Sequence, residues 1–131
     1  MTIQATGTIE AKSWDEEPYG ESGTRLSRVI ATNRFTGDIE ADATLGYLLA
    51  YTDEKTGTAI GFEQLTGSLA DRAGTFVMEH RGTFAADGVE IELRVVEGSG
   101  TDALTGIRGS GHFAAAYDGK PSPYTLDVEV A

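Results

Sequence analysis

The segment VEIELRVV, residues 89–96, decides the fold class because its apolar and charged side chains alternate almost throughout. Val89, Ile91, Leu93 and Val95 fall on one face of an extended chain, and the charged residues between them fall on the other. Successive side chains of a β-strand point to opposite faces. The segment therefore predicts a strand with one buried side and one side in water.

The same two-residue alternation recurs along the chain, whereas helical spacing is nearly absent. Further alternating runs begin at Val29, Leu45, Thr75 and Tyr124. Segments rich in turn-forming residues separate the runs, and the connections that they make are short. Short connections join antiparallel neighbours, because a parallel crossover needs about a dozen residues or more.

Counting the runs gives about eight strands in a single domain that spans residues 1–131. Eight antiparallel strands without helices form either a closed up-and-down barrel or a two-sheet sandwich. We predict the all-β, eight-stranded antiparallel up-and-down β-barrel. The predicted connections are residues 16–23, 35–38, 53–57, 70–74, 85–88, 97–103 and 117–123.

The segment GSGTDALTGIRGSGHF, residues 98–113, holds five glycines where a seventh strand is expected. We expect Gly106, Gly109 and Gly111 inside that strand, where glycine permits a bend and a close approach of the neighbouring backbone. Gly109 and Gly111 also share a face with Phe113, so they could instead leave space inside a barrel. A phosphate-binding loop is rejected, because neither a lysine nor a helix follows.

Several longer segments resemble a bacterial family of unknown function that has an allene oxide cyclase-like, or dirigent-like, β-barrel. The resemblance implies an eight-stranded barrel that often associates through its outer face, and it implies no established activity. Likeness of fold to a cyclase does not supply chemistry. The similar segments are TGTIEAKSWDE (6–16), FTGDIEADATLGYLLAY (35–51), GFEQLTGSLADRAGTFVMEHRGTF (61–84), VVEGSGTDALTGIRGSGHF (95–113) and YTLDVEV (124–130).

Composition and charge exclude several classes of partner. The formal net charge is −11, with ten basic residues scattered among 21 acidic ones, which disfavours nucleic acids and anionic membranes. The chain has no cysteine, so thiol catalysis and thiolate metal sites are excluded. With no visible signal peptide and no apolar run near the roughly 20 residues of a membrane helix, we expect a cytoplasmic protein.

His80 and Glu63 are the candidate catalytic residues. His80 lies between Met78 and Gly82 on the more apolar face of its strand. An imidazole there could transfer protons, or it could be a buried structural group that is hydrogen-bonded to a tyrosine. For Glu63, the alternation leaves the inward and the outward orientation equally open. If it points inward, the carboxylate needs a partner, and a carboxylate–imidazole pair would form an acid–base couple.

An apolar cavity with a few polar groups is the usual form of a small-molecule site. Trp14 is expected at the end of the first strand, where it could close a barrel mouth or fill the end of the core. His112 is expected outside and without a role, and we predict no metal site and no cofactor. The candidate binding residues are Trp14, Asn33, Tyr47, Tyr51, Phe76, Met78, Phe113 and Tyr124.

Two classes of function remain open from the sequence. The first is a barrel that binds a small apolar ligand or substrate and isomerises or cyclises it. The second is a non-catalytic ligand carrier, or a structural oligomer whose interior is filled by side chains. A homo-oligomer, with a dimer favoured, is expected from the resemblance, although the outward apolar residues Ile30, Leu48 and Val96 are too few to define a patch.

Overall fold

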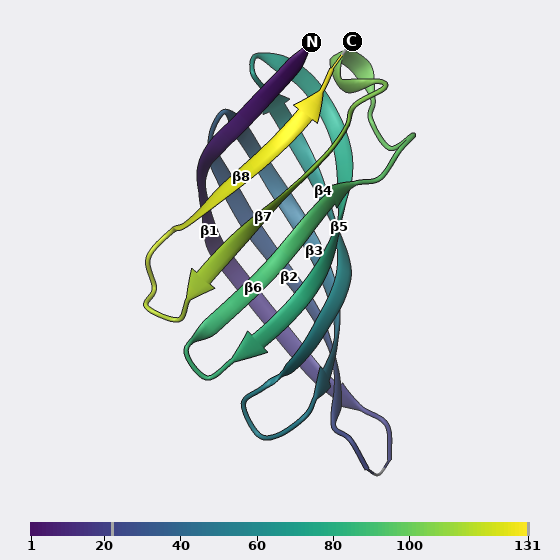
Figure 1. Cartoon of the computed structure of the whole chain (residues 1–131). Coiled ribbons are helices and arrows are strands. Elements are labelled where there is room, and N and C mark those ends of the chain that lie inside the picture. Colours follow the sequence, from purple (N-terminus) through teal and green to yellow (C-terminus); the bar gives the residue numbers. More distant parts are fainter. Residues whose placement is uncertain (22, 131) are drawn as a thin grey trace.

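Eight antiparallel strands close into one barrel, in which each strand pairs with its neighbours in sequence and β1 pairs with β8 (Figure 1). The computed structural model describes residues 1–21 and 23–130. The closed order of strand pairing confirms the predicted barrel and excludes the sandwich. The strands are β1 (Thr2–Tyr19), β2 (Leu26–Gly37), β3 (Ile39–Tyr51), β4 (Gly57–Leu69), β5 (Arg72–Ala85), β6 (Gly88–Val95), β7 (Arg108–Ala116) and β8 (Ser122–Glu129).

The inner faces of the strands form the core, as the alternation predicts. In β6, Ile91, Leu93 and Val95 are buried, while the glutamates and the arginine between them are exposed. Residues of β2, β3 and β8 alternate in the same way. Within the described ranges, no helix has the length and apolar character that a membrane span needs.

The connection between β6 and β7 plugs one end of the barrel, next to the two termini (Figure 1). It contains a single 3-10 turn, η1 (Asp102–Leu104), and buries Leu104 and Ile107 among the core residues. The backbone N–H of Thr101 donates to the Thr75 carbonyl at 2.9 Å and ties the connection to β5. This end of the interior is therefore filled by the protein itself.

In the glycine-rich segment, the structure differs from two expectations, the position of Gly106 and the space beside Gly109 and Gly111. Gly106 lies in the turn before β7 rather than inside the strand, with a φ of +84° that favours glycine. Gly109 and Gly111 lie in β7 but leave no empty space, because a Cβ on either would collide with a backbone carbonyl of β8, that of Asp127 or Thr125. These two glycines let the backbones of β7 and β8 approach closely.

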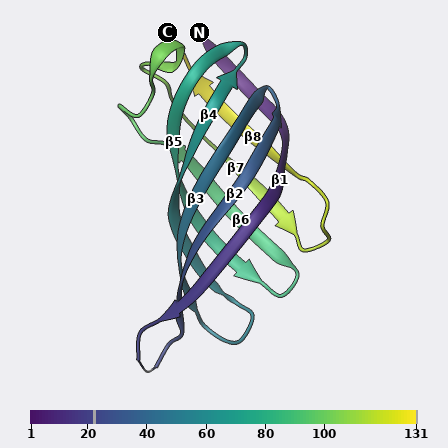
Figure 2. The same ribbon diagram turned by 180° about the vertical axis from the view of Figure 1, so that it is seen from behind.

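Strand β1 is longer than predicted and runs along the whole barrel (Figure 2). Residues 16–19 belong to β1 rather than to the predicted loop, and Ser22 of that loop lies outside the described residues. The register shifts between Ala11 and Ser13, which marks a β-bulge. Trp14 therefore lies within the strand and not at its end.

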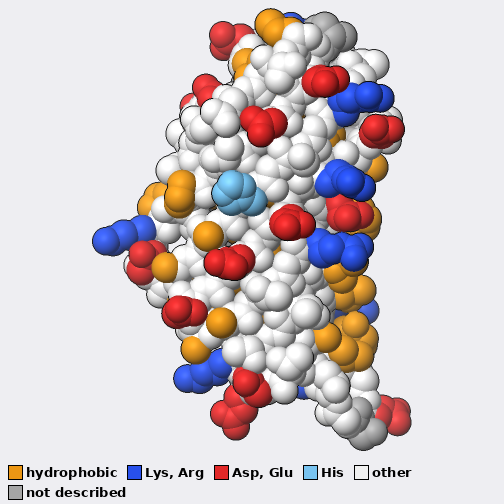
Figure 3. Space-filling view, in the orientation of Figure 1, with side chains coloured by type: hydrophobic (Ala, Val, Ile, Leu, Met, Phe, Trp, Pro, Cys, Tyr) orange, Lys and Arg blue, Asp and Glu red, His pale blue; other side chains and the backbone are white. Residues whose placement is uncertain are grey.

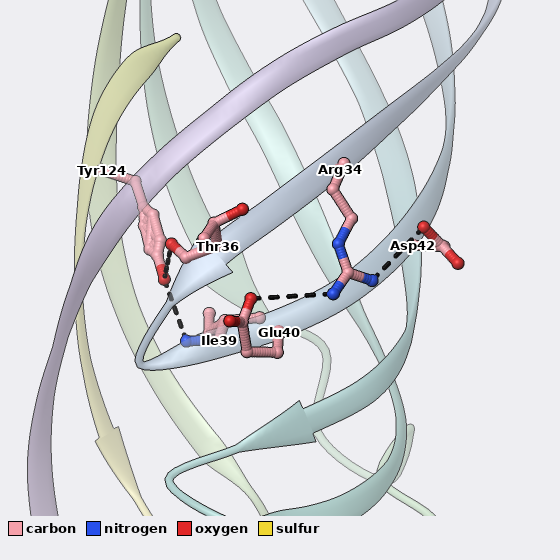
Figure 4. A network of polar contacts seen from close by, with 6 residues as sticks. All are labelled: Arg34, Thr36, Ile39, Glu40, Asp42 and Tyr124. Carbon is pink, nitrogen blue, oxygen red and sulfur yellow. Dashed lines mark hydrogen bonds and ion pairs between the residues drawn. The ribbon is translucent and has the colours of Figure 1, made fainter.

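Tyr124 secures the closed end of the barrel. Its hydroxyl oxygen accepts a hydrogen bond from the Ile39 backbone N–H at 3.0 Å, and it donates to the Thr36 carbonyl at 3.4 Å (Figure 4). On the outside of the same turn, Arg34 forms ion pairs with Glu40 and Asp42 (Figure 4). The β2–β3 turn is thus anchored from both sides of the sheet.

Candidate functional site

The other end of the barrel contains a cavity of about 600 Å³. This volume lies within the range of about 300–1,000 Å³ that small-molecule sites occupy. Most of the wall is apolar, whereas a short chain of polar side chains lies deeper inside. The apolar wall includes Ile9, Leu45, Leu49, Ala59, Phe84, Val89, Ile91, Phe113 and Ala115.

The cavity has a mouth because two neighbouring strands differ in length. The pairing of β1 with β8 ends at Ile9, which lies opposite Ser122. From Glu10 to Tyr19, β1 pairs with β2 but has no partner from β8 in the described residues. Residues of this half of β1 and of the β7–β8 connection line the cavity on its two sides. The mouth therefore lies between them.

Four polar side chains from four adjacent strands form one chain of hydrogen bonds inside the barrel. The Tyr47 hydroxyl lies 2.8 Å from His80 Nδ1, and His80 Nε2 lies 2.9 Å from Glu63 Oε1. Asn33 Nδ2 donates to Glu63 Oε2 at 2.8 Å. All four residues line the cavity. Asn33 lies on β2, Tyr47 on β3, Glu63 on β4 and His80 on β5.

Gly61 brings the two rings of this chain together. The strand register places it between Tyr47 on β3 and His80 on β5. A Cβ at Gly61 would collide with the Gly46 backbone carbonyl and would lie 2.9 Å from Tyr47 Cδ1, so a larger residue would push β3 and its tyrosine away. The rings of Tyr47 and His80 meet edge to face, with centroids 5.4 Å apart.

The chain of hydrogen bonds is complete and almost fully buried. Glu63 is 0% exposed and His80 is 1% exposed, and in the described part of the chain no buried side-chain N or O atom lacks a partner. An unpaired carboxylate at this depth would be costly. The hydrogen bonds from Asn33 and His80 therefore explain how Glu63 is tolerated in an apolar barrel.

The positions of the protons in this chain determine what Tyr47 presents to the cavity. With a neutral imidazole that donates from Nε2 to the Glu63 carboxylate, Nδ1 of His80 accepts from the Tyr47 O–H, whose oxygen can then accept from a ligand. With a charged imidazole, Nδ1 donates, and the Tyr47 O–H is free to donate to a ligand. Burial, and then the charge of Glu63, raise the pKa of Tyr47, so the phenol remains protonated at neutral pH.

A second group of residues lies at the mouth. Glu16 accepts hydrogen bonds from Trp14 Nε1 at 3.1 Å and from the Tyr51 hydroxyl at 2.6 Å. The Arg25 guanidinium lies 3.7 Å from the centroid of the Tyr51 ring. Burial acts to raise the pKa of Glu16, but the hydrogen bonds from Tyr51, Trp14 and Ser27 and the charge of Arg25 together lower it.

The structure brings most of the candidate residues together. Trp14, Asn33, Tyr47, Tyr51 and Phe113 line the cavity, together with both candidate catalytic residues, His80 and Glu63. The inward orientation of Glu63 settles the alternative that the alternation leaves open. His112 is exposed, as expected.

Three candidate binding residues lie elsewhere. Phe76 and Met78 are buried in the core of β5, and Tyr124 belongs to the closed end described above. None of the three is among the residues that line the cavity. They share the apolar face with the cavity residues, but they sit nearer the plugged end of the barrel. We therefore treat them as core residues.

Sequence reasoning misses three residues of the mouth, Glu16, Tyr117 and Lys120. All three fall in predicted connections, Glu16 in residues 16–23 and the other two in residues 117–123. The spacing of Trp14 and Glu16, two residues apart, is the signal that could have placed both on one face of a continuing strand. In the described ranges, no three His, Asp or Glu side chains are grouped so that they could hold a metal ion.

Comparison with known proteins gives a family and a fold. Residues 5–128 match the model of a family described as protein of unknown function (DUF3224). A crystal structure of a DUF3224 protein of unknown function from Shewanella oneidensis MR-1 is similar, with 26% identity and a TM-score of 0.79. The match covers 100% of this chain and 99% of that one. No curated protein matches the chain.

Proposed function

The chain belongs to the DUF3224 family of proteins of unknown function, and from the geometry of its interior we propose that the barrel binds a small, largely apolar molecule in the open end. The observation that carries the proposal is the cavity of about 600 Å³, whose apolar wall surrounds a complete chain of polar side chains. A structural barrel whose interior is filled by side chains, which is the alternative left open by the sequence, would contain no such cavity.

The Tyr47 hydroxyl is the group best placed to contact a polar atom of the ligand. His80 and Glu63 are already engaged within the chain, since both nitrogens of His80 and both oxygens of Glu63 have partners. Tyr47 is 7% exposed, against 1% for His80 and 0% for Glu63. The ligand that fits is an apolar body carrying one hydroxyl, carbonyl or amine near its buried end.

Fluorescence of a neutral apolar dye tests the proposal. The probe is N-phenyl-1-naphthylamine, which gains fluorescence in apolar surroundings and accepts energy from tryptophan. Trp14 is the only tryptophan in the chain, and it lines the cavity. We expect the dye to bind, to brighten and to quench the emission of Trp14.

A matched pair of variants locates the bound dye. Ala115 lines the cavity, whereas its neighbour Ala114 is exposed on the outer face of β7. Ala115→Phe fills the space and should weaken dye binding at least about tenfold, because a steric clash opposes the ligand. Ala114→Phe should leave binding unchanged. Equal binding by both variants, with both shown to be folded by circular dichroism, would contradict the proposal.

Acid–base chemistry on the bound molecule is the second candidate function. The serial bonding of Tyr47, His80 and Glu63 favours it, because with a charged imidazole Nδ1 donates to the Tyr47 oxygen and the Tyr47 O–H donates a hydrogen bond to a substrate carbonyl oxygen. Solvent removes the proton from the α-carbon and later returns one to carbon, while Tyr47 keeps its own proton. An isomerisation or cyclisation of a largely apolar substrate would use such a step. Burial and the charge of Glu63 raise the pKa of Tyr47, so the phenol keeps its proton and can act as a hydrogen-bond donor.

Deuterium exchange tests this second candidate. The probe is 2-tetralone, an apolar ketone whose α-protons exchange when the carbonyl oxygen is stabilised during enolisation. We expect the protein to accelerate exchange into the ketone in D₂O and Tyr47→Phe to remove the acceleration. Exchange at the rate of buffer alone would remove the catalytic candidate and leave the binding proposal standing.

A further inference from the structure

The outer surface of β2–β4 carries a patch that the core does not explain. Ile30, Leu48, Ile60 and Phe62 are each between 42% and 56% exposed. The strand register makes them neighbours, since Leu48 pairs with Ile60, and Gly46 lies between Ile30 and Phe62. Large apolar side chains that gather on a soluble surface usually mark a contact site.

These four residues belong to two parallel rows that cross strands β2–β6, and we take the two rows together as the patch. The first, which we call row A, runs in register through Arg28, Leu48, Ile60, Arg81 and Glu92. The second, row B, lies two residues away along each strand. It runs through Ile30, Gly46, Phe62, Glu79 and Arg94. In Figure 3, hydrophobic side chains emerge beside basic and acidic ones at the right-hand edge, where Figure 1 places β4 and β5.

We propose that a second copy of this chain covers the patch, with a two-fold axis that runs between row A and row B and parallel to both. Such an axis sets row A of one copy against row B of the other at the same strand. Leu48 then faces the side chain-free Gly46 of the partner, and Ile60 faces Phe62. Each contact occurs twice, as in any isologous dimer.

Charge complementarity selects this arrangement. Arg81 of row A faces Glu79 of row B across the axis, and Glu92 faces Arg94, so that opposite charges meet at both strands. A two-fold axis along the strands between β3 and β4 would instead place Arg28 of one copy against Arg81 of the other, and like charges oppose association. Within one copy, Arg81 Nε lies 3.9 Å from Glu79 Oε1, so the dimer would join two such pairs into a cluster of four charges.

The shape of the surface supports the same facing of row A and row B. A groove of about 910 Å³ runs along the outer face of β4–β7 and includes Ile60, Arg81 and Glu92 of row A among its walls. The axis sets the partner's row B, which includes Phe62, against row A at the edge of this groove. The patch also holds three of the ten basic residues, so this face opposes self-association less than the remainder of a surface with a net charge of −11.

Sedimentation with charge-reversal variants tests the proposal. The wild-type chain should sediment as a dimer at micromolar concentration. Arg81→Glu and Glu79→Arg each place like charges opposite one another twice, so each should weaken dimerisation at least about tenfold. Mixing the two variants in equal amounts should restore a dimer, because both facing pairs become opposite in charge again.

Arg108→Glu is the control, because Arg108 begins β7 and lies outside both rows. It should sediment as the wild type does, and circular dichroism should show a folded barrel for every variant. A monomeric wild-type chain would overturn the proposal, as would single variants that remain dimeric or a mixture that stays monomeric. None of these outcomes changes the expected dye binding inside the barrel, so this proposal and the proposed function fail separately.

Discussion

Glu63 is the residue on which the interior chemistry depends. A carboxylate without exposure to water requires hydrogen-bond donors, and Asn33 provides one from β2 and His80 another from the adjacent β5. The opposite face of β4 carries Ile60 and Phe62, which are exposed. Strand β4 thus buries a charged side chain and exposes large apolar ones, which is the reverse of the usual pattern. For this reason, the alternation alone could not show which face of β4 points into the barrel.

Removal of the imidazole should destabilise the barrel. His80→Ala leaves the Tyr47 hydroxyl and one Glu63 oxygen without a partner in a buried site, which costs about 1–3 kcal/mol in the free energy of unfolding. Urea denaturation measures the change. The exposed histidine provides the matched control, because His112→Ala should change stability by no more than about 0.5 kcal/mol. Equal effects of the two variants would contradict the hydrogen-bonded chain.

Glu16, at the mouth of the cavity, should make the free energy of unfolding depend on pH. Its pKa is lowered from the ordinary value of 4.5, so the folded state favours the ionised form. The resulting stabilisation is fully present above the pKa of the unfolded chain and is lost as the pH falls through the lower pKa of the folded state. The effect should be small, because Glu16 is only partly buried.

Comparison with Glu16→Gln at two pH values isolates this contribution. At neutral pH the wild-type chain should unfold at a higher urea concentration than the variant. The difference should shrink at a pH well below the ordinary value of 4.5, as the pH falls through the lowered pKa of the folded state and the carboxylate takes up a proton. A difference that grows on acidification would show that the assigned direction of the pKa shift is wrong.

Among the elements, β7 shows how glycine shapes the barrel. A Cβ at Gly111 would lie 2.7 Å from Leu126 Cα and would collide with the Thr125 carbonyl, so β8 would have to move. Gly111→Ala should therefore cost about 3 kcal/mol or more. At Gly98, in the β6–β7 connection, a Cβ would have no atom within 4 Å, and only the φ of +86° is unfavourable for alanine. Gly98→Ala should therefore lower the free energy of unfolding by about 1–2 kcal/mol. Thermal denaturation that ranks Gly98→Ala as the more harmful change would refute this account of the glycine-rich segment.

The alternation of apolar and polar residues predicts the existence of the strands well but predicts their ends poorly. Pro18 makes residues 16–23 look like a loop, yet it lies in β1 opposite Ser27. Proline is tolerated there because this half of β1 pairs on one side only and needs no second ladder of hydrogen bonds. The plug formed by Leu104 and Ile107 is equally invisible locally, since its burial depends on contacts with distant strands.

For the whole molecule, closure could not be derived from periodicity. A barrel and a sandwich share the same alternation, and the pairing of β1 with β8 that distinguishes them joins the two ends of the chain. The same pairing determines the site, because it stops at Ile9 and leaves a mouth. The sequence could therefore identify Trp14, Tyr47 and His80 as candidates, but it could not show that they surround one cavity.

Methyl NMR of the protein with N-phenyl-1-naphthylamine tests the central claim, binding inside the barrel, most directly. Leu48 and Leu49 are adjacent in β3, yet Leu48 is exposed on the outer face and Leu49 lines the cavity. The isoleucines offer a second pair, with Ile91 inside and Ile30 outside. We predict nuclear Overhauser effects from the dye to the methyl groups of Leu49 and Ile91. Effects confined to Leu48 and Ile30 would place the dye on the outer surface and contradict the account.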